Sequence, residues 1–231
     1  MSKNFLFILI FFLFSSIWAC SGLLGSLNKD MLDESTIISG LKEALSIGTE
    51  KAVKKTSIID GYFGNKMIKI LMPENIQKVA DVLKKIGFQK QVDDFVLSMN
   101  RSAEKAAPQS LSIFSDAVKN MTFEDARKIL KGGKTSATEF FKRKTYDKIY
   151  KAFKPIISSN MDEVGVTRSY KEMMSKYENI PFIDKESIDL DHYVTNKAID
   201  GLFHMIGNEE KEIRTNPAAR ATKLLKTVFS N

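Results

Sequence analysis

Apolar residues recur at intervals of three and four along most of the chain, the spacing that places them on one face of an α-helix. No segment alternates apolar and polar residues over strand length with the β-branched enrichment that a sheet needs. The pattern therefore predicts a single all-α domain of roughly eight to ten helices and no sheet. The expected helices occupy 34–55, 73–86, 92–106, 111–118, 122–131, 136–154, 155–164, 167–177, 189–206 and 217–229.

Proline, glycine and capping residues indicate where these helices begin and end. Pro73 suits the first turn of a helix, because its missing N–H needs no partner there, and Gly87 is expected to end that helix in a left-handed conformation. Thr122 is expected to cap the helix over 122–131, and residues 136–139 (SATE) fit a capping box. Pro155 is expected to stop the helix that follows.

The first twenty residues differ in composition from the rest of the chain. Lys3 is their only charged residue, and residues 5–14 form ten consecutive apolar positions. A membrane-spanning helix needs about 20 apolar residues, so this shorter stretch predicts a signal peptide over 1–19, cut after Ala19. Residues 20–32, which contain Gly, Ser and scattered Leu, are expected to be a tether to a domain over 33–231.

Residues 17–20 (IWAC) resemble the lipobox of bacterial lipoproteins, although Trp18 stands where a small residue is usual. The resemblance implies that Cys20 carries a thioether-linked lipid and becomes the mature N-terminus, and that Ser21 directs the protein to the outer membrane. Cys20 is the only cysteine, which excludes an intramolecular disulfide and a cysteine-rich zinc site. The alternatives are a stray thiol left after ordinary cleavage and a thiol inside the cleaved segment. With a lipid, the membrane would be the first partner, and the domain would face the periplasm.

The charge balance changes the picture only slightly. The chain has 35 Lys and Arg against 28 Asp and Glu, a net charge of +7, and loses one lysine with residues 1–19. An exported protein does not meet the chromosome, so the excess favours anionic lipid headgroups or other envelope polyanions over nucleic acid. The charges are interspersed, however, with no like-charge run longer than 142–144, which is also what an ordinary solvated surface shows.

Two motifs suggest a ligand site, but neither meets the requirements of that site. Residues 132–135 (GGKT) end like a phosphate-binding loop, but Lys128 stands where the first glycine belongs and a helix precedes in place of a strand. His192 and His204 would lie about 18 Å apart along a straight helix, too far to share one metal ion. We therefore expect helix-ending glycines, a helix cap at Asp189 or Asp191, and neither a metal nor a cofactor.

Four other residues are candidates for a polar site. Asp200 and His204 are four apart, on one face of an expected helix, and form either a surface pair or one side of a pocket. Arg101 and Arg143 lie on helices with apolar neighbours and either pair with a buried carboxylate or bind an anion. No catalytic residue is predicted, because sequence alone gives no proximity between candidate groups.

Many segments of the chain resemble, in order, the bacterial domain-of-unknown-function family 4197. The resemblance covers nearly all of 33–230 and implies exported helical envelope proteins, often with lipoprotein-type signals, with no catalytic residues to carry over. The matching segments are DGYFGN (60–65), SMNRSAEKAAP (98–108), MTFEDARKILKGGKTSATEFFKRKT (121–145), FKPII (153–157), VGVTRSY (164–170), LDHYVTNKAIDGLFHMI (190–206) and EEKEIRTNPAARATKLLKTVF (209–229).

These observations lead to one expected function and two alternatives. The expectation is a lipid-anchored envelope protein that binds or scaffolds an envelope protein without catalysing a reaction. A carrier of lipid or another hydrophobic ligand would use the same Phe- and Met-rich core if it enclosed a cavity. An enzyme would need a polar pocket near Asp200 and His204 or near Arg101 and Arg143.

Overall fold

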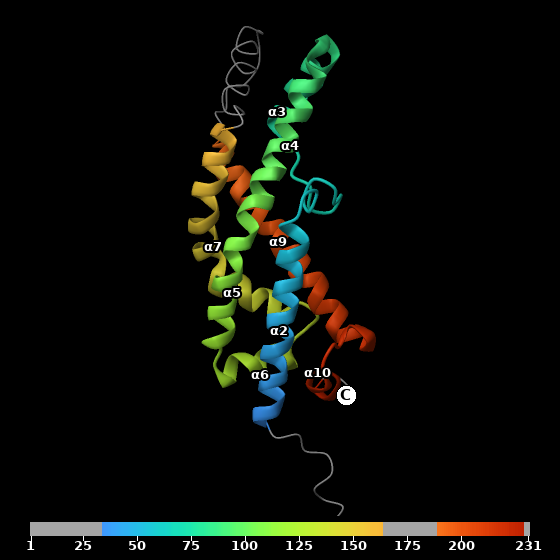
Figure 1. Ribbon diagram of the computed structural model, residues 1–231, viewed down its shortest axis with the longest axis vertical. Coiled ribbons are helices and arrows are strands. Elements are labelled where there is room, and N and C mark those ends of the chain that lie inside the picture. Colours follow the sequence, from blue (N-terminus) through green and yellow to red (C-terminus); the bar gives the residue numbers. More distant parts are fainter. Residues whose placement is uncertain (1–33, 164–188, 229–231) are drawn as a thin grey trace, which may run out of the picture. The chain divides into compact units, whose positions relative to one another are not determined.

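The computed structural model describes residues 34–163 and 189–228, which form helices and turns and, within these ranges, no strand (Figure 1). The chain divides into a first unit, 1–37, and a second unit, 38–231. Only the opening turn of α2 is described in the first unit, so the architecture below is that of the second. None of the described helices is both long enough and apolar enough to cross a membrane.

The described residues form six continuous α-helical runs, fewer than the eight to ten expected. One reason is that α3, α4 and α5 join without a break, through a π-helical turn at Lys84–Phe88 and a 3-10 turn at Ala107–Gln109. Another is that α7 spans two expected helices. The individual α-helices within these runs are α2 (Glu34–Thr56), α3 (Glu74–Leu83), α4 (Gln89–Ala106), α5 (Ser110–Lys119), α6 (Phe123–Lys131), α7 (Ser136–Glu163), α9 (Leu190–Thr215) and α10 (Lys223–Val228).

Several local signals act as predicted. Gly87 has φ +99° and kinks the run between α3 and α4. Thr122 caps α6 reciprocally with Asp125, since each side chain accepts a hydrogen bond from the other residue's backbone N–H. Asp189 caps α9 by accepting from the His192 N–H at 2.9 Å. These signals depend on residues within one helical turn, so they need no tertiary information.

Four boundary predictions were wrong. The helix expected to end near Ile206 continues to Thr215. The hydroxyl of Ser136 donates to the Gly133 carbonyl and forms no capping box. The last helix begins at Lys223, because Asn216 caps only a short 3-10 turn at Pro217–Ala219. The most informative error is at Pro155, which lies inside α7.

Burial explains why α7 continues past Pro155. A proline inside a helix costs about 3 kcal/mol, because it removes one hydrogen bond and crowds the preceding turn. Phe153, Ile157 and Met161, on one face of α7, have no exposed surface, and burying each such side chain contributes about 1.5–3 kcal/mol. The packed face thus outweighs the proline. The predicted helix at 167–177 lies outside the described residues.

The core of the second unit is a continuous apolar cluster where α7 packs against α9, α4 and α5 (Figure 1). Phe114 stands at its centre, with edge-to-face contacts to Phe141 at 5.3 Å and Phe203 at 6.0 Å between ring centroids. A second, smaller cluster joins Ala44 of α2 to Ile213 and Leu225 near the C-terminal end.

Candidate functional site

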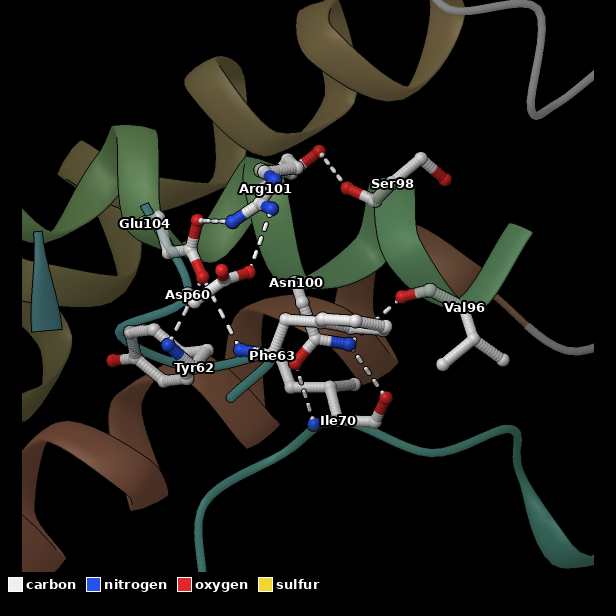
Figure 2. A network of polar contacts seen from close by, with 10 residues as sticks. Asp60, Tyr62, Phe63, Ile70, Val96, Ser98, Asn100, Arg101 and Glu104 are labelled. Carbon is white, nitrogen blue, oxygen red and sulfur yellow. Dashed lines mark hydrogen bonds and ion pairs between the residues drawn. The ribbon is translucent and has the colours of Figure 1, made fainter. Parts of the chain in front are cut away.

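The segment between α2 and α3, residues 57–72, is held in place by the side chains of α4 and is called the pinned loop below. Its central tie is Glu104, a buried carboxylate on α4. One oxygen, Oε1, accepts from the backbone N–H of Tyr62 at 3.0 Å and of Phe63 at 3.2 Å (Figure 2). A charged acceptor strengthens both bonds, so the loop backbone is fixed where it turns.

Arg101 completes this tie. Its Nη1 donates to Glu104 Oε2 at 2.6 Å and its Nη2 to Asp60 Oδ1 at 2.7 Å, so one guanidinium bridges the helix and the loop (Figure 2). These contacts, that with Glu104 first, raise the pKa of Arg101 above its ordinary value. Asp60 has a left-handed backbone, φ +64°, which Asp tolerates better than most residues. Arg101 was expected either to pair with a carboxylate or to bind an anion, and its geometry is that of carboxylate pairing.

Asn100 holds the later part of the pinned loop, residues 66–72, which is called its second limb below. Its buried amide accepts from the Ile70 N–H at 2.8 Å and donates to the Ile70 carbonyl at 2.8 Å, as a neighbouring strand would (Figure 2). The same amide nitrogen donates to the Val96 carbonyl within α4 at 2.7 Å. Both backbone polar groups of Ile70 are therefore hydrogen-bonded, although the residue belongs to neither a helix nor a sheet.

Tyr62 anchors the pinned loop to α9. Its ring is fully buried, and its hydroxyl donates to the Ala198 carbonyl at 2.7 Å. Burial, with a smaller effect of Glu104, raises the pKa of the Tyr62 hydroxyl well above its ordinary value. Gly201 makes room for this ring: a Cβ at that position would lie 2.7 Å from Tyr62 Cε1. The glycine is therefore required by close approach.

Despite these ties, the pinned loop exposes large apolar side chains. Ile58 is 57% exposed, Ile59 78%, Met67 72% and Leu71 58%. Among the other described large apolar side chains, only Ile86 is more than half exposed. Figure 1 shows the loop standing out from α4 on the side away from α7. A backbone fixed by buried polar contacts thus displays aliphatic groups to solvent.

Asp200 and His204 line an open groove beside the pinned loop, with a volume of about 280 Å³. Met67, Lys69 and Lys197 are among its other lining residues. Asp200 and His204 are both exposed, and Asp200 Oδ1 lies 3.7 Å from Lys142 Nζ. The predicted pair is thus brought to one groove, where the nearest ion-pair partner of the aspartate is a lysine on α7.

The remaining predicted residues are not part of this arrangement. Arg143 is exposed on α7, where its positive charge repels that of Lys128 on α6. His192 Nδ1 lies 2.8 Å from the Tyr150 hydroxyl and its Nε2 2.9 Å from the Asn196 amide nitrogen. Within 34–163 and 189–228, no cluster of His, Cys, Asp and Glu is placed to hold a metal ion. Ala19 and Cys20 lie outside the described residues.

Sequence reasoning missed the two residues that hold the loop. Asn100 and Glu104 follow Val96 at intervals of four, so they continue one helical face and are buried on it. A polar residue at such a position needs a partner, which is a usable signal for a buried tie. The identity of the partners, which lie 42 residues earlier for Glu104 (Tyr62) and 30 for Asn100 (Ile70), could not be read from this signal.

The fold and the site define an all-α protein with one polar-tied loop that displays apolar side chains. The family described as protein of unknown function DUF4197 matches residues 31–230, and the chain belongs to this family. The resemblance found in the sequence is thereby confirmed. No curated protein and no solved structure matches the chain.

Proposed function

We propose that this chain is a non-enzymatic binding protein of the bacterial cell envelope and that it docks on its partner through the pinned loop. The observation that carries the proposal is the exposure of Ile58, Ile59, Met67 and Leu71 on a backbone held by Glu104. Burying one such side chain contributes about 1.5–3 kcal/mol. A loop that is already ordered loses little conformational entropy on binding, so that part of the cost of association is avoided.

The geometry favours docking at the surface over carriage of a hydrophobic ligand inside the bundle. The apolar pocket between α2, α7 and α9, lined by Leu41, Phe141 and Ile206 among others, has a volume of about 20 Å³. That space holds roughly one water molecule and is too small for an acyl chain. The polar groove at Asp200 and His204 is the place where an enzymatic alternative would be sought, but both side chains are exposed to solvent.

Site-specific photocrosslinking tests the docking surface. A diazirine amino acid replaces Ile59 in the full chain, expressed in a bacterial envelope, and Leu111, an apolar residue of α5 that is 41% exposed, is the matched control. We expect an adduct with protein or lipid at position 59 that is absent at 111 and absent when Glu104→Ala unties the loop. No adduct at 59, or equal adducts at both positions, would rule out the pinned loop as the docking surface.

The envelope location belongs to the same proposal and has its own test. Cys20→Ser should release the protein from membranes after processing, or block its processing, because the acyl chains supply the anchor. Fractionation of cells and intact-mass analysis of the mature chain measure this. Unchanged membrane association, or a mature chain without fatty acids, would remove the lipid anchor from the proposal.

A further inference from the structure

The charge around the pinned loop is strongly one-sided. Residues 51–72, which add the last turn and a half of α2 to the loop, contain five lysines and one acidic residue, Asp60. Asp60 is paired with Arg101, which also pairs with Glu104, so these three groups together carry one negative charge against the five lysines. The lysines at 51, 54 and 66 are exposed, that at 55 is paired with Glu209 at 2.5 Å, and that at 69 lies over the Phe63 ring.

Lysines and exposed apolar residues follow one another along both limbs of this segment. Lys54 and Lys55 precede Ile58 and Ile59. On the other limb the order from 66 to 71 is lysine, methionine, a buried residue, lysine, a buried residue, leucine. This arrangement is typical of segments that lie at a membrane interface, where aliphatic groups enter the boundary of the acyl chains and lysines reach the lipid phosphates.

We infer that the pinned loop docks on the surface of an anionic lipid bilayer, with Ile58, Ile59 and Met67 entering the interface. The inference rests on the proposed function, because it names the partner of that same surface. Its charge complements the negative headgroups, to which each nearby lysine adds attraction. The ties to Glu104 and Asn100 keep the backbone N–H groups of Tyr62, Phe63 and Ile70 hydrogen-bonded within the protein as nearby apolar side chains leave water.

Two other partners fit the surface less well. A second copy of the chain, joined by a two-fold axis through this loop, would bring the same basic segment against itself. A protein partner is usually bound through Trp, Tyr and Arg, with lysine depleted. Here the aromatic Tyr62 is buried, Phe63 is half-buried beneath Lys69, and Arg101 is occupied, so aliphatic and lysine side chains make up most of what is displayed.

An environment-sensitive dye on the loop tests the inference in the full chain. Cys20→Ser leaves no other cysteine, so Ile59→Cys can be labelled alone, with Leu111→Cys as the control position. The probes are vesicles of phosphatidylcholine with phosphatidylglycerol and vesicles of phosphatidylcholine alone. The apolar leader can hold the chain on either vesicle, so the readout is the local one: the emission shift of the dye and its quenching by nitroxide lipids.

We expect a blue shift and quenching at position 59 with the anionic vesicles, neither with the neutral ones, and neither at position 111. Salt should weaken the effect, because it screens the lysines. Lys54→Gln and Lys66→Gln should each lower the equilibrium constant for loop insertion about fivefold. Lys131→Gln, an exposed lysine of α6, should leave it unchanged.

Two results would overturn the inference. Equal shifts on neutral and anionic vesicles would mean that charge does not select the surface. No shift on either vesicle would mean that the loop does not enter lipid. In that case the crosslinking at position 59 separates the two proposals: a protein adduct keeps the docking function with a different partner, whereas no adduct removes both.

Discussion

Replacing Glu104 by alanine removes the acceptor on which the pinned loop depends. The backbone N–H groups of Tyr62 and Phe63 lose their partner, and Arg101 keeps only Asp60. Hydrogen bonds to a charged group contribute about 1.5–3 kcal/mol each, and the Tyr62 residue is fully buried, so water cannot replace that bond. The Arg101 side chain is 33% exposed, which reduces the worth of its ion pair.

We therefore expect Glu104→Ala to lower the free energy of unfolding by about 3–5 kcal/mol, the range for breaking a buried charged network. Glu104→Gln keeps the shape of the side chain and one acceptor oxygen. Its amide oxygen can still serve Tyr62 and Phe63, while the amide group facing Arg101 loses the ion pair. The loss should then be about 1–2 kcal/mol. Urea unfolding followed by far-ultraviolet circular dichroism measures both variants.

The matched control is Glu124→Gln on α6, where an exposed carboxylate pairs with exposed Lys128 and the unfolding midpoint should not move. Amide hydrogen exchange at Tyr62 and Phe63 should accelerate in Glu104→Ala alone. Equal losses in the alanine and glutamine variants would mean that the ion pair, and not the backbone tie, holds the loop. Unchanged stability and exchange in both would refute the reasoning altogether.

Three further changes probe the other ties. Asn100→Ala should cost about 2–4 kcal/mol in urea unfolding and expose the Ile70 amide to exchange, because two buried backbone groups lose their partner; unchanged Ile70 exchange would contradict this. Gly201→Ala should cost about 1–3 kcal/mol, since the new Cβ meets the Tyr62 ring, whereas Gly133→Ala, with open space around it, should cost nothing measurable. In Tyr62→Phe, stability should fall less steeply with pH above about 10 than in the wild type. The buried hydroxyl has a raised pKa, so the wild type is stabilised below that pH and loses this stability as the unfolded chain ionises; parallel pH profiles would refute the assignment.

Helix formation was largely predictable because it depends on neighbours in sequence. The three-and-four spacing of apolar residues indicated the helical class, and local caps such as Thr122 and Asp189 act within one turn. Pro155 shows the limit of this reasoning. Its local preference is to end a helix, but the buried face of α7 runs across it, and that burial depends on the helices packed around it.

The candidate site was predictable only in part. Arg101 stood out as a residue to pair with a carboxylate, and Asp200 and His204 do line one groove. The partners of Arg101 were not foreseen, because Asp60 precedes it by 41 residues and no local pattern links them. Likewise, nothing near Ile59 in sequence indicates that it remains exposed while its neighbours are tied down.

By itself the sequence determined the helical class, the family, several caps and the basic character of residues 51–72. These features depend on composition and on contacts within a turn or two of helix, which a linear pattern contains. The tertiary structure decided that α7 continues past Pro155, that Glu104 and Asn100 are buried as ties, and that Gly201 must leave space for Tyr62. Each of these depends on which distant side chains meet, and that is settled only when the chain packs.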